Sequence, residues 1–345
     1  MSRRFTIVAV ALALVAAACS GGNKQAAPRQ RATSTQLPTT TTAPPVYPLT
    51  GLAAADPARL ARPALVVKIE NIDAARPQAG LADADVVYEE VVEGGQSRLV
   101  VVFQSKDSDP IGPIRSVRPS DPAIIKPLNP LFAFSGGTAK FKNMVQAAGI
   151  VDIDYENACC GRAYYRRPGR AAPHNVYSST ARLYSMHPDT TPPPKIFDFL
   201  APGQPFGGAG AAPATHLAAN LAVRTVADYT YDPVTRTWKR VSNGTPQVVE
   251  GGVQVAPTNV IVWFVPYTIS PGDVDPVGEP VSVAQVVGTG EAWVLSLGAV
   301  VKGRWSKPTP EAPVAFTDAA GAPIRIAPGP TWVEIQPVGT PAVVQ

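Results

Sequence analysis

The stretch from residue 76 to residue 121 constrains the fold most, because it combines two apolar runs with a turn dipeptide. The runs cover residues 86–92 and 99–103, and Gly94 and Gly95 lie between them. Paired glycines between apolar runs let the chain reverse tightly. We therefore expect an antiparallel hairpin here.

Charged residues gather at the turn end of this hairpin and in the Gly-Pro loop that follows it. The hairpin contributes Glu89, Glu90, Glu93 and Arg98, and the loop contributes Arg115, Arg118 and Asp121. So many charges around apolar strands favour a site over a solvated face. Since side chains alternate along a strand, Glu89 and Glu93 should share one face of the hairpin, with Glu90 on the other.

These residues allow three interpretations. Guanidinium groups bind phosphate and carboxylate bidentately, so the four arginines Arg76, Arg98, Arg115 and Arg118 could converge on an anionic group. An enzyme could instead use Asp121 or Glu93 to hold a divalent metal, or Glu89 and Glu93 as a glycosidase pair. The third interpretation is a structural network in which the arginines pair with Glu89, Glu93 and Asp121.

The N-terminus has the pattern of an exported lipoprotein. Residues 1–19 comprise two arginines, an apolar run of about 14 residues that is short for the ~20 of a membrane span, and an Ala-Ala-Ala-Cys end. We expect Cys19 to carry the lipid, palmitate included, although ordinary signal-peptidase cleavage is the alternative. Residues 20–47 are rich in Thr, Pro and basic residues and should form a disordered tether.

Composition excludes some classes of partner and cofactor. The formal net charge is +4, and five of the 30 basic residues precede residue 47, so the rest of the chain is nearly balanced and no nucleic-acid partner is expected. His174, His187 and His216 show no metal-ligand spacing. Cys159 and Cys160 are interpreted as idle thiols. We predict neither a metal nor another cofactor.

Local patterns predict an α+β fold with two domains. In residues 48–205 we expect a mixed α/β domain with strands over 64–69 and 131–134, a helix capped by Thr138 that ends near residue 148, and a short helix over 179–186. A Pro/Gly-rich segment over 190–210 is the candidate boundary. Residues 215–338 should form a smaller, mostly antiparallel β domain, with a hairpin over 226–241 and strands over 259–265, 281–287, 292–297, 300–305, 314–317, 323–326 and 331–335.

Residues 155–177 form a loop-rich insertion with four arginines and two adjacent tyrosines, Tyr164 and Tyr165. Interleaved arginines and aromatics suit contacts with a polyanion or a sugar ring. A solvated basic loop is an equally good interpretation.

Several segments together carry a family resemblance. ARPQAGLADADVVYE, EGGQSR, FQS, IGPIRSVRPSD and PHNVYSS, followed later by NVIVWFV, GTGEAWVL, GRWSK and GPTWVEI, closely resemble the YerB-type bacterial lipoproteins, a domain of unknown function. The resemblance covers roughly residues 48–337. It implies a membrane-anchored extracytoplasmic lipoprotein with two domains, and it implies no activity.

We therefore expect a cell-envelope lipoprotein that is lipid-anchored on the extracytoplasmic face of the cell membrane. As a binding module it would take an anionic wall polymer, a lipid-linked precursor or a partner protein. The alternative is an envelope enzyme, a metal-dependent phosphotransferase or a glycan-cleaving enzyme, that uses the Arg/Asp/Glu cluster. The predicted binding residues are Arg76, Glu89, Glu93, Arg98, Arg115, Arg118, Asp121, His174 and Asn175.

Overall fold

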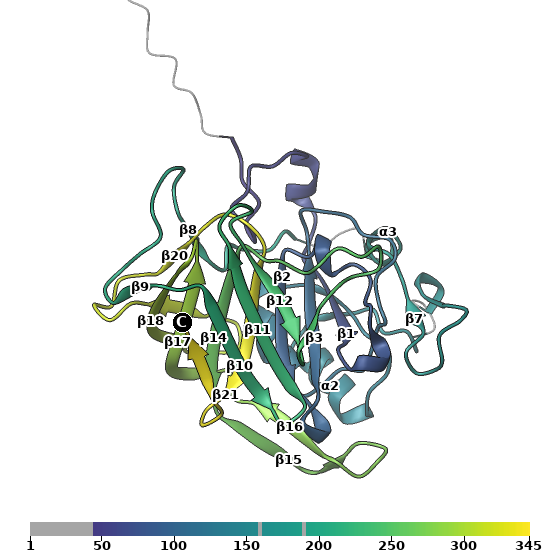
Figure 1. The fold of residues 1–345 in the computed structure, drawn as a ribbon. Coiled ribbons are helices and arrows are strands. Elements are labelled where there is room, and N and C mark those ends of the chain that lie inside the picture. The colour runs from purple at the N-terminus through teal and green to yellow at the C-terminus, as the bar shows by residue number, and fades with distance from the viewer. Residues whose placement is uncertain (1–43, 158–160, 188–190) are drawn as a thin grey trace, which may run out of the picture. The chain divides into compact units, whose positions relative to one another are not determined.

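The computed structural model describes residues 44–157, 161–187 and 191–345, and the predicted hairpin lies at the centre of its largest sheet (Figure 1). Strand β2 (Val86–Val91) pairs antiparallel with β3 (Ser97–Phe103), and a 3-10 turn over Glu93–Gly95 makes the reversal. Gly94 and Gly95 have φ angles of 63° and 69°. Glycine adopts this left-handed region at little cost, which explains the dipeptide at this turn. The hairpin prediction is confirmed.

The largest sheet has eleven strands, ordered β19-β18-β17-β14-β21-β2-β3-β1-β4-β5, with β9 paired to β18. Its other strands are β1 (Leu65–Glu70), β4 (Leu131–Ala133), β5 (Val151–Asp152), β9 (Ala211–Pro213), β14 (Asn259–Val265), β17 (Gly288–Ser296), β18 (Ala299–Lys307), β19 (Ala315–Thr317) and β21 (Thr331–Pro337). Strands β2 and β21 pair in parallel, with Glu89 beside Glu334. Both predicted domains therefore contribute strands to one sheet, while the boundary between them stays a prediction.

A second sheet packs against the first (Figure 1). Its order is β13-β12-β11-β10-β22, from β10 (His216–Ala222), β11 (Thr225–Asp232), β12 (Thr237–Ser242), β13 (Thr245–Pro246) and β22 (Ala342–Val344). The hairpin expected over 226–241 is β11 with β12. Three two-stranded ribbons complete the strands described: β15 (Tyr267–Val274) with β16 (Pro280–Ala284), β8 (Asp198–Phe199) with β20 (Arg325–Ile326), and β6 (Tyr165–Arg166) with β7 (Val176–Tyr177).

Helices are few and short in the described residues. They are α1 (Asp121–Ile125), α2 (Ala139–Ala147) and α3 (Thr180–Tyr184). Thr138 caps α2 by accepting the Phe141 N–H at 3.3 Å, as expected. Strands predominate in the structure, and the two predicted domains, 48–205 and 215–338, share the largest sheet. Residues 48–205 contain less helix than the prediction of a mixed α/β domain implied. Proline-rich connections account for this, because proline interrupts helices.

Side chains cover the central strands on both faces. One face packs against the second sheet through residues such as Trp238 and Tyr229, and the other packs against α1 and α2 through residues such as Ile125 and Phe141. Strands buried on both faces consist of nearly continuous apolar runs. A charged residue inside such a run therefore needs a partner, and these residues define the site below.

Residues 1–43 and 158–160 lie outside the described part of the chain. The predictions for the signal peptide, for Cys19, for most of the tether and for Cys159 and Cys160 fall there. Within the described residues, no helix has both the length and the apolar character that crossing a membrane requires.

Candidate functional site

The hairpin presents its acidic residues to two opposite faces of the sheet. Glu89 points toward the second sheet, where it meets Arg240, and Glu90 points the other way, where it meets Lys68. Glu93 lies past the end of β2 and contacts Arg118 on the Glu90 side. The prediction that Glu89 and Glu93 share a face is wrong, because alternation ends where the chain enters the 3-10 turn. This separation also removes the predicted glycosidase pair.

Three of the four predicted arginines gather on the Glu90 side around two carboxylates. We call Arg98, Arg115, Arg118, Glu70 and Glu93 the arginine cluster. Arg98 and Arg115 share Glu70, with 3.6 Å between Arg98 Nε and Glu70 Oε1, and Arg118 Nη2 donates to Glu93 Oε2 at 2.7 Å. Three cations thus face two carboxylates in this cluster.

Strand pairing and backbone hydrogen bonds position the cluster. Arg98, the second residue of β3, lies directly opposite Glu70, the last residue of β1. The Arg115 backbone N–H donates to the Lys68 carbonyl at 2.9 Å, and its carbonyl accepts from Ser135 at 2.9 Å. The Gly-Pro loop is therefore fixed between β1 and the end of β4.

Arg98 is the least satisfied charge in the cluster. Its side chain is only 8% exposed, yet among the described residues its guanidinium donates one hydrogen bond, at 3.4 Å to the Ser116 carbonyl. A guanidinium has five N–H groups and no acceptor. Burial, together with the nearby Arg118 and Arg115, lowers the pKa of Arg98 to about 10 despite Glu70. A buried cation with so few partners favours an incoming anion.

A deeper layer lies under the cluster and is closed. Lys68 donates to Glu90 and, at 2.6 Å, to Asp121, and the Arg118 backbone N–H also donates to Asp121 at 2.6 Å. Burial raises the pKa of Glu90 to about 7, although Lys68 opposes the shift. Asp121 was predicted as a ligand or metal residue, and here its two oxygens are occupied by protein donors.

A cavity of about 250 Å³ opens beside Arg118. Its lining combines polar residues with apolar ones: Glu93, Ser116, Arg118, Gly137, Thr138, Phe141, Val274, Asp275, Pro276 and Val281. Gly137 and Thr138 lead directly into α2, whose first backbone N–H groups carry a partial positive charge. The sequence predicted the helix that Thr138 caps without connecting it to Arg118.

The fourth arginine, Arg76, lies on the other face of the sheet and does not join the cluster. It donates to Ser242 Oγ at 2.6 Å and to the Asn71 carbonyl at 2.9 Å. The prediction that all four arginines converge is therefore wrong for Arg76. The loop that carries Arg76 docks on the second sheet, so its side chain cannot reach the Glu90 side.

A second charged group, which we call the closed network, lies between the two sheets. It comprises Glu89, Arg240, Glu334 and Tyr229, all with side chains fully buried. Arg240 pairs with Glu89 and lies 3.6 Å from Glu334 Oε1, and its Nε donates to Tyr229 Oη at 2.9 Å. Asn71 Nδ2 donates to Glu89 at 2.7 Å. Two carboxylates share one guanidinium, and burial together with Glu89 raises the pKa of Glu334 to about 8.

Of the two predicted residues from the 155–177 insertion, one lies at the edge of the arginine cluster. His174 Nδ1 is 3.4 Å from Glu70 Oε2, and Asn175 Oδ1 accepts from Arg166 at 2.7 Å. His174 thus borders the cluster, while Asn175 belongs to the loop surface. Arg167 and Arg170 both contact Glu250.

Sequence reasoning missed Glu70, Lys68 and the closed-network partners Arg240 and Glu334. A signal was available for the first two, because both are charged residues inside the apolar run LVVKIE. Arg240 is 151 residues from Glu89, and no local pattern links them.

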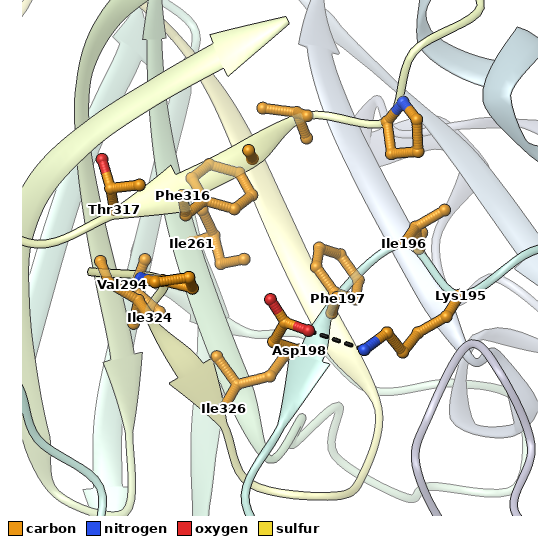
Figure 2. Close-up of a pocket in the computed structure, with 14 residues that line it drawn as sticks. Lys195, Ile196, Phe197, Asp198, Ile261, Val294, Phe316, Thr317, Ile324 and Ile326 are labelled. Atoms are coloured by element: carbon orange, nitrogen blue, oxygen red, sulfur yellow. Dashed lines mark hydrogen bonds and ion pairs between the residues drawn. The ribbon is translucent and has the colours of Figure 1, made fainter. Parts of the chain in front are cut away.

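A separate apolar cavity of about 330 Å³ is lined by residues of β14, β17 and β19, which lie on the other side of β21 from the hairpin. Figure 2 shows its lining side chains. Ile261 and Val294 form part of its wall, with Phe197 and Phe316 nearby, and a Lys195–Asp198 ion pair at 2.7 Å lies at its side. No predicted site residue lines it.

In the described residues, no group of three His, Cys, Asp or Glu side chains is arranged to hold a metal ion. Glu93 and Asp121, the predicted metal residues, are paired with Arg118 and Lys68. The arrangement therefore presents guanidinium donors, rather than clustered carboxylates, to an incoming ligand.

Comparison with known proteins gives consistent matches. The N-terminal domain model of DUF3048, described as a protein of unknown function, matches residues 49–192, and the C-terminal domain model matches residues 217–333. A curated relative from Bacillus subtilis (strain 168), named "Putative lipoprotein YerB", is 33% identical over 136 residues, which are 38% of this chain and 39% of that protein. The match therefore spans well under half the length of that relative.

The crystal structure of YerB protein from Bacillus subtilis has the same fold. It superposes with a TM-score of 0.72 at 22% identity and covers 87% of this chain and 99% of that chain.

Proposed function

Since the chain belongs to the DUF3048 family, whose members are of unknown function, we propose that it is an extracytoplasmic lipoprotein whose arginine cluster binds an anionic group. This proposal includes a lipid on Cys19 that anchors the chain to the outer face of the cell membrane. It also includes a domain boundary between residues 205 and 215. The name of the Bacillus relative supports the lipoprotein part.

Arg98 carries the binding part. Its guanidinium is buried, donates one long hydrogen bond within the described part of the chain and has two further arginines nearby. Burying a cation costs several kcal/mol, and among the described residues a 3.6 Å pairing with Glu70 and one long hydrogen bond offset this cost for Arg98. An anion that reaches this cluster would be stabilised by charge-assisted hydrogen bonds. The neighbouring cavity gives such an anion access to Arg118, Ser116 and Thr138.

The ligand's source could be a wall polymer, a lipid-linked precursor or an acidic segment of a partner protein, as each carries anionic groups. Enzymatic use of the same cluster is less well supported, because Asp121 and Glu93 are occupied by protein cations.

The test is calorimetric titration of inorganic phosphate and pyrophosphate into the full-length chain. Arg118→Gln should weaken binding by about 10- to 100-fold, since a hydrogen bond to a charged group contributes ~1.5–3 kcal/mol. The matched control is Arg304→Gln, an exposed arginine on β18. Arg115→Gln serves as a second cluster variant that is more exposed and less disruptive.

Unchanged binding in both Arg118→Gln and Arg115→Gln, or no binding in the unmodified protein, would overturn the proposed site. A circular dichroism melt of each variant establishes that it is folded before titration.

A further inference from the structure

The β15–β16 ribbon forms one wall of the cavity beside Arg118. It is a separate two-stranded sheet, drawn at the lower edge of Figure 1. Its base is fixed close to the arginine cluster, because the Ala284 N–H donates to Ser120 Oγ at 2.9 Å and Tyr267 Oη donates to the Ile335 carbonyl at 3.0 Å. Farther along the ribbon, Asp273 pairs with Lys140 of α2 at 2.5 Å.

The ribbon faces the cavity mainly with apolar side chains. Val274, Pro276 and Val281 line it, and Phe141 of α2 also contributes to the lining. Val274 is 57% exposed, so this wall has apolar surface that a ligand could bury. An apolar wall does not contribute to the binding of an inorganic anion, because anions are bound by hydrogen-bond donors and not by hydrocarbon.

The charges around Arg118 limit how anionic the ligand can be. Glu93 pairs with Arg118, and Asp275 also lines the cavity. Asp275 Oδ1 accepts the N–H groups of Val277 and Glu279 at 2.9 Å each, which holds the ribbon turn. Two carboxylates beside one cavity-lining arginine disfavour a long polyanion and favour a ligand with one anionic group.

Resting on the proposed function, we infer that the ligand is an amphiphile, with a single phosphate-type head group at the arginine cluster and an apolar chain along the β15–β16 ribbon. The head group lies toward Arg118, Ser116 and Thr138, and the chain lies between Phe141 and Val274. The arginine cluster would thus bind the head group, and the β15–β16 ribbon would bind the chain.

The experiment is a chain-length series. Inorganic, methyl, butyl and hexyl phosphate are titrated into the full-length chain at constant ionic strength. Each methylene that becomes buried contributes about 0.8 kcal/mol, so affinity should rise by up to about fourfold per carbon. The rise should level off within about six carbons, because a cavity of ~150 Å³ already holds benzene and the head group takes part of this one.

Val274→Ser should flatten this series, because it should lower the affinity for hexyl phosphate more than the affinity for inorganic phosphate. The control is Val277→Ser in the same ribbon turn, since Val277 is 82% exposed and does not line the cavity. If the Val277→Ser series is flattened as much as that of Val274→Ser, the chain does not lie in the cavity and the inference fails.

The possible failures can be told apart. Binding of all four phosphates with equal affinity and with dependence on Arg118 would overturn the amphiphile but keep the proposed function. Binding of none would overturn both. Flotation with vesicles that contain 20% phosphatidic acid then identifies the source: Val274-dependent flotation indicates a membrane lipid, and its absence, with alkyl phosphates still bound, indicates a soluble ester.

Discussion

The closed network and the arginine cluster begin at neighbouring residues of one strand, yet they have opposite balances of charge. Glu89 leads to the closed network, where two carboxylates share one guanidinium, and Glu90 leads to the side where three guanidinium groups share two carboxylates. The closed network is fully buried between two sheets, whereas the arginine cluster borders a cavity.

Their hydrogen bonding differs in the same sense. The guanidinium of Arg240 donates hydrogen bonds to Glu89, Tyr229 and Gln247, so its Nε and both Nη atoms have partners. Arg98 donates once among the described residues. A charged group that is sealed and satisfied stabilises the fold, while one that is open and under-satisfied can bind a ligand. Charge content alone does not distinguish the two, since both contain arginine and glutamate.

The largest effect should come from Arg240→Met. Removing one partner of a buried ion pair leaves an uncompensated charge, which typically costs ~3–5 kcal/mol, and here the buried Glu89 carboxylate loses its cation. Chemical denaturation at pH 7 should show this loss. Arg304→Met, at an exposed position, should stay within about 0.5 kcal/mol of the unmodified protein. If Arg118→Gln lowers the free energy of unfolding as much as Arg240→Met does, the arginine cluster stabilises the fold as strongly as the closed network, and the proposed contrast between them is wrong.

The second effect is a dependence of stability on pH. The folded-state pKa of Glu334 is about 8, above the 4.5 of a solvent-exposed glutamate, so the folded protein binds a proton that the unfolded chain has released. The free energy of unfolding should therefore fall as the pH rises from about 4.5 to about 8. Denaturation curves between pH 5.5 and 8.5 measure this slope.

Substitutions separate the contributions of Glu334 and Glu90, which lie on opposite faces of the sheet, to the pH dependence of stability. Glu334→Gln should flatten the curve up to about pH 8, whereas Glu90→Gln should flatten it only up to about pH 7, the folded-state pKa of Glu90. A stability that rises steadily between pH 6 and 8, in either variant or in the unmodified protein, would contradict the protonated state of these buried acids.

How much of the fold and of the site could be predicted depends on how far apart in the sequence the interacting residues are. The β2–β3 hairpin was predicted because its information is local: two apolar runs and Gly94-Gly95. The cation at the centre of the closed network could not be predicted, because Arg240 meets Glu89 only after the second sheet packs on the first. The charged residues of LVVKIE offered a clue, since burial on both faces requires partners for Lys68 and Glu70.

Among the strands that the sequence did not predict, β15 and β10 were missed for local reasons. Strand β15 contains Pro271 and Gly272, which argue against a strand interior, and as part of a ribbon outside both large sheets it tolerates them. Strand β10 reads HLAANLA and has no β-branched residue. Since β15 forms a wall of the cavity, missing it hid the connection between Arg118 and α2.

The smallest effect on stability should come from the contact that holds the β15–β16 ribbon against α2. The chain offers a closely matched control, because Lys140–Asp273 and Lys239–Asp232 are both exposed pairs, with lysine side chains 53% and 49% exposed and aspartates 17% exposed in each. Exposed pairs contribute little, so neither Lys140→Ala nor Lys239→Ala should shift the denaturation midpoint. Their local effects should differ.

Lys140→Ala releases the ribbon that walls the arginine cluster, while Lys239→Ala acts on β12 in the sheet that covers the closed network. Amide hydrogen exchange should therefore accelerate over residues 267–284 in Lys140→Ala and stay unchanged there in Lys239→Ala. Exchange at Glu89 and Glu334 should be unaffected in both variants. Equal protection of the ribbon in the two variants would show that its base contacts alone hold it, and that the cover of the arginine cluster is as fixed as that of the closed network.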